Sequence, residues 1–392
     1  MNLPKLPIYL DYNATTPVDE RVLAAMLPFF TEQFGNAASR THAFGWAAEE
    51  AVKQARQEIA ALIGAAPEEI IFTSGATEAC NLALKGVFEA YATKGNHIIT
   101  CATEHKAVLD TCLHIEKMGG QVTYLPVDAA GLIDLAELES AITEKTILIA
   151  IMYANNETGV LQAVRDISAL AARKNVLFFT DATQAVGKIP VDVQADGLHL
   201  MAFSAHKMYG PKGVGALYVR RRNPRVRPTA QMDGGGHERG MRSGTLNVPG
   251  IVGFGRACAI AQSEMKEDAG RLLALRNRLE AALCALPGVS RNGSAEQRLP
   301  HVANLSFNQV ESEGLMLRLS KDMALSSGSA CTSATLAPSY VLKAMGLSDE
   351  AAYSSLRFSL GRFTTPEEID YAIQKTARAV EGLRQLRVGL DF

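Results

Sequence analysis

The sequence lacks the features that define several common classes of protein. It has no excess of one charge, because 39 Lys and Arg nearly balance 41 Asp and Glu to give a formal charge of −2. This balance gives no global reason to expect a nucleic acid or an acidic membrane as partner. Its apolar runs are short, and TILIAIMYA at 146–154 is less than half the length of a membrane-spanning helix. No internal repeat or low-complexity segment is present.

The cysteine pattern excludes a disulfide framework and a structural zinc site. The six cysteines show no CxxC pair and no Cys/His ligand spacing, which predicts free thiols, most of them buried, and no metal requirement. The N-terminal MNLPKLPIYLDYNATTP lacks the apolar core of a signal peptide. We therefore expect a cytoplasmic protein, or one from an organelle whose targeting segment is absent here. The basic run VRRRNPRVR at 219–227 is interpreted as a solvated edge or a docking patch for another protein.

What the sequence does contain is an alternation of short apolar runs with helical segments. The runs are rich in β-branched residues and suit buried strands, while the helices between them suit parallel crossovers. We predict a large α/β domain over residues 1–262 with a mostly parallel, seven-stranded sheet. The expected strands are EIIFT, NHIIT, QVTYLPV, TILIAIMY, LFFTD, LHLMAFS and GALYVR.

The pattern changes near residue 263, where SEMKEDAGRLLALRNRLEAALCAL has the pattern of a long charged amphipathic helix. The strand VANLSFN, a loop of small residues and a final helix follow. Thr365 to Glu368 offer that helix an N-cap, a proline in the first turn and a capping-box glutamate. Residues 263–392 are predicted to form a smaller α+β domain, on which the N-terminal arm, residues 1–15, is expected to pack.

Polar residues follow several of the predicted strands, where open α/β sheets bind ligands. The turn at 73–77 offers free N–H groups and a hydroxyl at a helix N-terminus, which suits a phosphate or an ordinary N-cap. Asp181 ends LFFTD, with Gln184 one turn later. Its carboxylate could cap the next helix or hold a pyridinium nitrogen protonated, as a pyridoxal phosphate site requires.

The stretch SAHKMYGPKGVG brings Lys207 to the same edge, flanked by Ser204 and His206, which can donate hydrogen bonds to a phosphate. A phosphate would use the charge of this lysine, whereas a carbonyl compound could form a Schiff base with its amine. GPKGVG lacks the Lys-Ser/Thr pair of a nucleotide-binding P-loop and does not lie between a strand and a helix, so we reject both nucleotide interpretations.

Two further candidates are a histidine and a cysteine. His105 follows the strand HIIT and could stack on a flat ring and move protons, although a lone histidine is more often structural. Cys331 lies in LSSGSACTSAT at 325–335, whose small polar residues predict a mobile surface loop. A thiol there is either a chance exposed cysteine or a reactive one, and the loop composition favours reactivity.

Taken together, these segments resemble the cysteine desulfurases, pyridoxal-phosphate enzymes of the aminotransferase class V group with fold type I. The resemblance is close to the bacterial enzymes of iron–sulfur assembly and covers nearly the full length. Ala205 is one departure, since the family commonly has glycine there. The matching segments, in the expected order, are YLDYNATTPVD, FGNAAS, FTSGATE, TEHKAVLD, NNETG, DATQAVGK, SAHKMYGPKG, GGGHERGMRSGT, SSGSACTS and LRFSLGRFTT.

The resemblance implies a cofactor role for most of the candidates. Lys207 would carry pyridoxal 5′-phosphate as a Schiff base, and Asp181 would pair with the pyridine nitrogen. His105 would stack on the ring, and Gln184 would bond the phenolic oxygen. Asn156 would also bind the cofactor. Four residues would hold its phosphate: Ala76, Thr77, Ser204 and His206. Thr245 would reach that phosphate from the other subunit of an obligate homodimer.

The resemblance also implies the reaction and its partners. Asn156 and Arg357 would receive the carboxylate of L-cysteine, and Lys207 would remove the α-proton. The Cys331 thiolate would attack the substrate sulfur, release alanine and carry the sulfur as a persulfide. Acceptors could be iron–sulfur scaffolds, tRNA-thiolation proteins or nitrogenase maturation proteins, and Cys331 could transiently bind a cluster.

Two alternatives remain. A selenocysteine lyase or an aminotransferase would use the same Lys207 and Asp181, but an aminotransferase has no need of Cys331. A non-catalytic binding partner would be expected to lose Lys207, Asp181 or Cys331, and all three are present.

Overall fold

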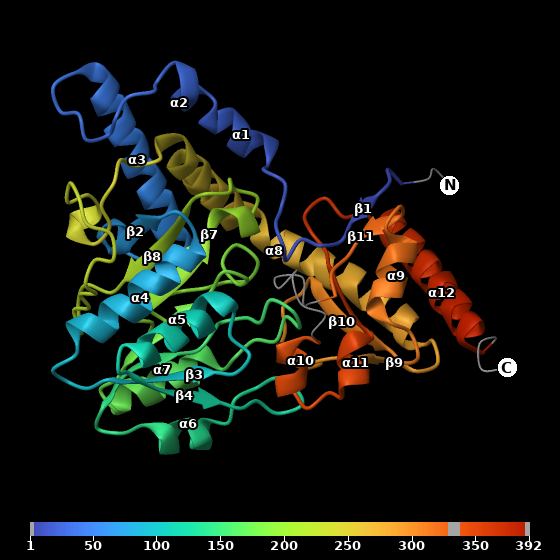
Figure 1. The fold of residues 1–392 in the computed structure, drawn as a ribbon. Helices are drawn as coiled ribbons and strands as arrows, with labels where there is room; N and C mark the ends of the chain where they lie inside the picture. Colours follow the sequence, from blue (N-terminus) through green and yellow to red (C-terminus); the bar gives the residue numbers. More distant parts are fainter. Residues whose placement is uncertain (1–3, 328–337, 389–392) are drawn as a thin grey trace.

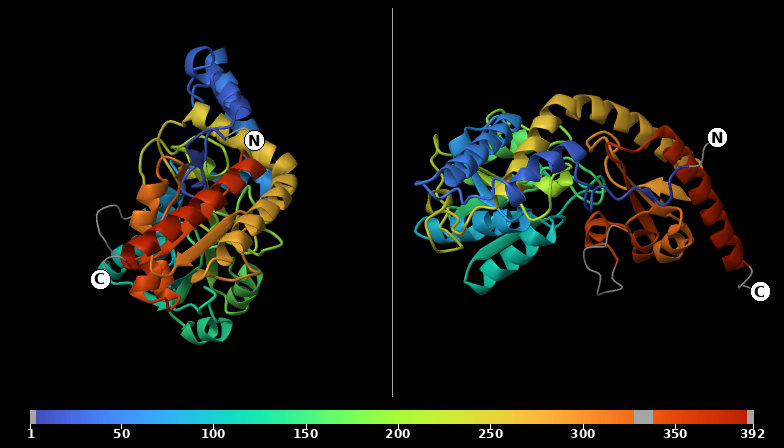
Figure 2. Two further views of the ribbon diagram at one scale, coloured as in Figure 1. Left: turned by 90° about the vertical axis from the view of Figure 1, so that its right-hand side faces the viewer. Right: turned by 90° about the horizontal axis from the view of Figure 1, so that it is seen from above.

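The computed structural model describes residues 4–327 and 338–388. A large body with a seven-stranded sheet and a smaller body with a three-stranded sheet lie side by side. The long helix α8 (Val248–Cys284) runs from one to the other, as the view from above shows most clearly (Figures 1 and 2). Within the described ranges, no helix combines the length and apolar character needed to cross a membrane.

Every predicted strand of the large sheet is present, in the order β2-β8-β7-β6-β5-β3-β4. Only β8 is antiparallel to its neighbours, so the prediction of a mostly parallel sheet is confirmed. The carboxyl ends of the other strands therefore meet at one edge. The strands are β2 (Ile70–Thr73), β3 (His97–Cys101), β4 (Gln121–Leu125), β5 (Thr146–Ala150), β6 (Leu177–Asp181), β7 (Leu200–Ser204) and β8 (Gly215–Val219).

Helices cover both faces of this sheet, which explains why its strands are apolar without alternation. The consecutive residues Phe178 and Phe179 are both fully buried, because side chains of a strand alternate between its faces. Phe178 belongs to the core under α3, α7 and α8, and Phe179 to the core under α4 and α5. The covering helices are α3 (Ala43–Leu62), α4 (Ala76–Ala90), α5 (Lys106–Lys117) and α7 (Val164–Arg173), while α1 (Glu20–Met26), α2 (Pro28–Thr31) and α6 (Leu135–Ala141) are peripheral.

The smaller body is built on an antiparallel sheet of order β12-β10-β9. The predicted capping box of its last helix is confirmed, since Thr365 N donates to Glu368 Oε2 (3.0 Å) and Glu368 N to Thr365 Oγ1 (3.2 Å). Its elements are β9 (Val289–Arg291), β10 (Val302–Phe307), α9 (Ser312–Leu319), β11 (Met323–Ala324), α10 (Tyr340–Ala344), α11 (Asp349–Tyr353), β12 (Ser355–Ser359) and α12 (Pro366–Val388).

Helix α8 begins at Val248, well before the start expected near residue 263. Its first half is apolar and small because it packs closely on α3: a Cβ added at Gly255 would lie 2.5 Å from Ala55 Cα. A segment buried in this way carries no charged face, so its sequence lacks the amphipathic pattern. The boundary expected at 262/263 falls inside this continuous helix, and the division into two domains stays a prediction.

The N-terminal arm lies on the small body before it enters the large one. Strand β1 (Ile8–Tyr9) pairs in parallel with β11, and Ile8 and Leu10 belong to the core of the small body. The next residues cross to the carboxyl edge of the large sheet.

Candidate active site

A cavity of about 490 Å³ lies at the carboxyl edge of the large sheet. The strand order brings the walls of the cavity together, because the segments that follow β2, β3, β5, β6 and β7 all begin at this edge. Thr245 is exposed outside this cavity, and Cys331 lies outside the described residues. Ten of the residues singled out from the sequence line it: Ala76, Thr77, His105, Asn156, Asp181, Gln184, Ser204, His206, Lys207 and Arg357.

Lys207 ends a single 3₁₀ turn, Ala205–Lys207, that directly follows β7. Its Nζ donates hydrogen bonds to the carbonyl oxygens of Asn13 (2.6 Å) and Ala14 (2.7 Å). A second amine lies nearby, because Lys188 Nζ donates to Gln184 Oε1 (2.9 Å). Burial, and then the positive charges of Lys207 and Arg357, hold the pKa of Lys188 well below its usual value. Its surroundings therefore disfavour the charged form of Lys188.

Asp181 is the last residue of β6, and its side chain is buried. Its Oδ1 accepts hydrogen bonds from the main-chain N (2.9 Å) and the Oγ1 (2.5 Å) of Thr183. The Cys80 thiol lies 3.9 Å from Oδ2, and burial together with the Asp181 charge raises the pKa of that thiol well above its usual value. A neutral thiol and a threonine thus orient a buried carboxylate, which is suited to keeping a ring nitrogen protonated.

The start of α4 provides an anion cradle. Its N-cap is Gly75, which has no side chain to cap the first N–H groups of this 15-residue helix. A Cβ added at Gly75 would meet only Ser204 Oγ, at 3.9 Å, whereas one added at Gly215 would lie 2.7 Å from Gly75 Cα. The turn is therefore open toward the cavity and held closely by β8 behind it. Uncapped N–H groups at a helix N-terminus bind phosphate well.

His206 lines the cavity beside this cradle, and its Nδ1 lies 3.1 Å from Thr15 Oγ1. Burial, and then the charges of Lys207 and Lys212, lower the pKa of His206 to about 4. The ring is therefore neutral near pH 7 and contributes a hydrogen bond and not a charge.

Arg357 reaches the cavity from β12 of the small body. Its Nη1 donates to the main-chain oxygen of Asn156 (2.9 Å), and its Nη2 to Asp11 Oδ1 (2.6 Å). Within the described part of the chain, the buried Arg357 Nε and Asn156 Oδ1 have no hydrogen-bond partner. Buried polar groups are normally paired, so both atoms fit a site whose ligand supplies the partner. A carboxylate matches the remaining guanidinium donors.

His105 is the N-cap of α5, and its Nδ1 accepts a hydrogen bond from Ala107 N (3.1 Å). This contact places the proton of the neutral ring on Nε2. The preceding Glu104 is fully buried, and burial raises the pKa of its carboxyl group well above the usual value. Tyr340 of α10 donates to the Glu104 carbonyl oxygen (2.6 Å), so the small body also helps to position this turn.

Asn13 is the principal residue of the site that the sequence did not single out. Its carbonyl oxygen accepts from Gln184 Nε2 (3.0 Å) as well as from Lys207, and its Nδ2 donates to the Asn156 carbonyl oxygen (3.0 Å). Its Oδ1 lies 2.9 Å from His301 Nε2. The only sequence signal was its place in DYNATT, because an irregular segment has no periodicity to interpret.

Comparison with known proteins agrees with this geometry. The family described as aminotransferase class-V matches residues 8–372, so the chain belongs to the aminotransferase class-V family. A protein named cysteine desulfurase IscS from Anaeromyxobacter sp. (strain Fw109-5) is 58% identical over 383 residues, covering 97% of this chain and 94% of the relative. One of the same name from Pectobacterium carotovorum is 58% identical over 384 residues, covering 97% and 95%. Within the family, the chain belongs to the cysteine desulfurases.

Solved structures give the same fold. A NifS-like protein, 39% identical, has a TM-score of 0.88 and covers 96% of this chain and 100% of that one. A protein described as SspA in complex with cysteine, 38% identical, has a TM-score of 0.81, with coverage of 91% and 100%. The expected fold type I is confirmed, and enzymes of this family depend on pyridoxal 5′-phosphate. The cavity fits that group through its anion cradle, its buried carboxylate and its lysine.

Proposed function

We propose that this protein converts L-cysteine to L-alanine and passes the sulfur, as a persulfide on Cys331, to acceptor proteins. The observation that carries the proposal is the convergence of Lys207, Asp181 and Arg357 on one cavity from three parts of the fold. Family membership among the cysteine desulfurases supports the same reaction.

Each wall of the cavity has a role in holding the cofactor. Pyridoxal phosphate supplies an electron sink to the bound amino acid. Asp181 would keep the ring nitrogen protonated, His105 would cover the ring, and Gln184 would bond the phenolic oxygen. The anion cradle would hold the phosphate through Ala76, Thr77, Ser204 and His206, and Asn156 would complete the set.

The substrate lies between the lysine and the arginine. Arg357 and Asn156 bind its carboxylate, and the Lys207 amine takes the proton from Cα. The Cys331 thiolate forms an S–S bond to the substrate sulfur as the Cβ–S bond breaks. The electron pair left on Cβ takes up a proton, and Cα regains the proton that Lys207 removed, so the products are alanine and a Cys331 persulfide. The persulfide sulfur then passes to an acceptor for iron–sulfur cluster assembly or tRNA thiolation.

We also propose that the enzyme works as a homodimer, with Thr245 of each subunit reaching the cofactor phosphate of the other. A group of exposed aromatic side chains on α2, α3 and the segment between them supports an interface, since monomers rarely expose large apolar patches. The group consists of Phe30, Phe34, Phe44 and Trp46, each more than half exposed. The buried unpaired thiols support a reducing compartment such as the cytoplasm.

The decisive experiment quantifies alanine and sulfide formed from L-cysteine in the presence of a reductant. Wild type should form both in equal amounts and Cys331→Ala neither, while Cys284→Ala, a partly buried thiol on α8, should behave as wild type. Alanine that persists in Cys331→Ala would indicate a lyase independent of this thiol. No alanine from wild type with bound cofactor would refute the proposal. Turnover of L-selenocysteine alone would favour a selenocysteine lyase.

A further inference from the structure

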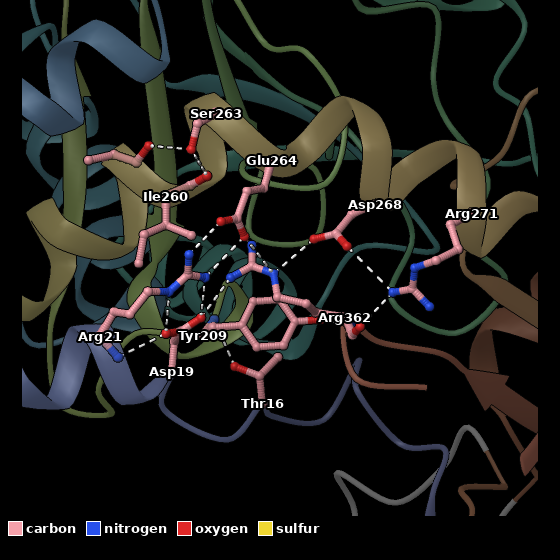
Figure 3. Close-up of polar contacts among 11 residues, drawn as sticks. Thr16, Asp19, Arg21, Tyr209, Ile260, Ser263, Glu264, Asp268, Arg271 and Arg362 are labelled. Carbon is pink, nitrogen blue, oxygen red and sulfur yellow. Dashed lines mark hydrogen bonds and ion pairs between the residues drawn. The ribbon is translucent and has the colours of Figure 1, made fainter. Parts of the chain in front are cut away.

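A compact network of charges around Arg362 and Tyr209 joins the two bodies of the fold (Figure 3). We call it the Arg362 junction. It balances three carboxylates with three guanidinium groups around one aromatic ring. Its members are Asp19, Arg21, Tyr209, Glu264, Asp268, Arg271 and Arg362.

Arg362 is the centre of the junction, and its side chain is only 9% exposed. Its Nη1 lies 3.0 Å from Asp19 Oδ2, in the large body, and its Nε donates to Asp268 Oδ2 (2.8 Å), on α8. Its guanidinium carbon lies 4.4 Å from the centre of the Tyr209 ring. Its main-chain N donates to the Tyr209 hydroxyl (2.5 Å). A planar donor group held on several sides in this way has a fixed position.

Tyr209 connects the junction to the segment that carries Lys207, because it lies two residues after that lysine. It has a φ of +67°, a left-handed conformation that a residue with a side chain keeps only when its surroundings enforce it. The surroundings are two hydrogen bonds: Tyr209 N donates to Thr16 Oγ1 (2.8 Å), and Asp19 N donates to the Tyr209 carbonyl oxygen (3.0 Å). Thr16 N in turn donates to the His206 carbonyl oxygen (3.0 Å).

On the other side, Arg362 follows β12, the strand that carries Arg357. The chain between them has little freedom, because a Cβ added at Gly361 would lie 2.1 Å from the Tyr12 ring. Beyond Arg362, Arg271 of α8 donates to the carbonyl oxygens of Arg362 (2.5 Å) and Thr364 (2.6 Å). The junction therefore fixes the segment that leaves β12 against the segment that leaves Lys207.

We propose that Arg362 is a positioning residue, which sets the distance between Arg357 and Lys207 and thereby the fit of the amino-acid substrate. The inference rests on the proposed function. The carboxylate and the amine of an amino acid are attached to the same carbon, so a substrate held at both ends tolerates little error in this distance. Two groups in different bodies need a rigid connection to meet that tolerance, and the junction provides it.

The test compares holoenzyme variants. Arg362→Gln removes the charge and the ion pairs, and we expect the KM for L-cysteine to rise about ten- to a hundredfold, as for a reactant misplaced by about 1 Å. Calorimetric titration with L-alanine should show an equal loss of affinity. Arg362→Lys, which keeps the charge without the planar fork, should lie in between. Cofactor absorbance should not change, because the residues expected to hold the ring and phosphate in this chain belong to the large body.

A matched control is Arg278→Gln on α8, because Arg278 Nη2 pairs with Asp370 at 2.5 Å in an exposed position. It should leave the KM and the L-alanine affinity unchanged. If Arg362→Gln fails to fold, Asp268→Asn decides, because it removes the negative charge of one ion-pair partner of Arg362 and leaves Asp19 in place. It should also raise the KM, but by less.

If the junction had a purely structural role, the Arg362 variants would have a lower unfolding temperature but the KM and the L-alanine affinity of wild type. That result would overturn the proposal. The two proposals fail separately. Wild type that binds L-alanine but makes none from L-cysteine would refute the desulfurase reaction alone. An Arg362→Gln holoenzyme that binds L-alanine as wild type does would refute the positioning role alone.

Discussion

The carbonyl oxygen of Asn13 accepts a 2.6 Å hydrogen bond from Nζ of Lys207, 194 positions further along the chain. The N-terminal arm thus supplies part of the candidate active site although it begins on the small body. The same asparagine contacts Gln184, Asn156 and His301. It connects the expected cofactor end of the cavity with the expected substrate end.

Asn13→Ala should weaken this connection without removing the carbonyl oxygen that Lys207 uses. The lost side chain removes one of the two donors to the Asn156 carbonyl oxygen, which keeps Arg357 Nη1, and leaves the buried His301 Nε2 without its partner. We therefore expect a loss of about 1–3 kcal/mol in the free energy of unfolding. Denaturation in urea measures it. An unchanged free energy of unfolding would mean that water replaces both contacts at no cost.

Asp181→Asn should retain the fold and lose activity. An amide cannot hold the cofactor nitrogen protonated, so we expect alanine formation from L-cysteine to fall by at least about 100-fold. Thr183→Val is the milder companion, because it removes only the side-chain hydrogen bond to Asp181 Oδ1. Comparable activity in Asp181→Asn and wild type would remove Asp181 from the mechanism.

Gly215→Ala tests the anion cradle. The added Cβ would lie 2.7 Å from Gly75 Cα and push the turn toward the cavity, at a cost of about 1–3 kcal/mol in packing. We expect weaker binding of pyridoxal phosphate to the apoenzyme, measured by fluorescence titration. Gly234→Ala is a poor control because it also strains a positive φ, whereas Gly270→Ala on α8 meets nothing within 4 Å and should bind as wild type.

Glu157 should make stability depend on pH. Burial raises the pKa of its carboxyl group to about 7 from 4.5, although Ser339 Oγ donates to it and Arg357 opposes the shift. A carboxyl group whose pKa is raised in the folded state makes its full contribution to the free energy of unfolding below pH 4.5. This contribution is lost as the pH rises through 7. We therefore compare the free energy of unfolding of Glu157→Gln with that of wild type at two pH values. The difference should favour the variant by about 3 kcal/mol more at pH 8 than at pH 5. Chemical denaturation at both pH values measures this difference, and equal differences would contradict it.

The strands of the large sheet could be predicted because each is short, apolar and β-branched, and is followed by a helix. Their polar successors, Asp181, Lys207 and His105, could be placed at one edge because carboxyl ends of parallel strands meet. The start of α8 was predicted wrongly, since the first half of this helix is largely buried and shows no amphipathic period. Thr245 as a contact from a second subunit and Cys331 as the sulfur carrier stay predictions.

The sequence by itself determined the sheet, its catalytic edge and the chemistry that residues such as Lys207 and Asp181 offer. Only the tertiary structure decided which distant groups meet: Asn13 with Lys207, Asp11 with Arg357, and Asp19 with Arg362. The physical reason is the range of the interactions. Propensity and periodicity act between neighbours in the chain, whereas these hydrogen bonds and ion pairs form between segments that packing brings together and leave no local pattern in the sequence.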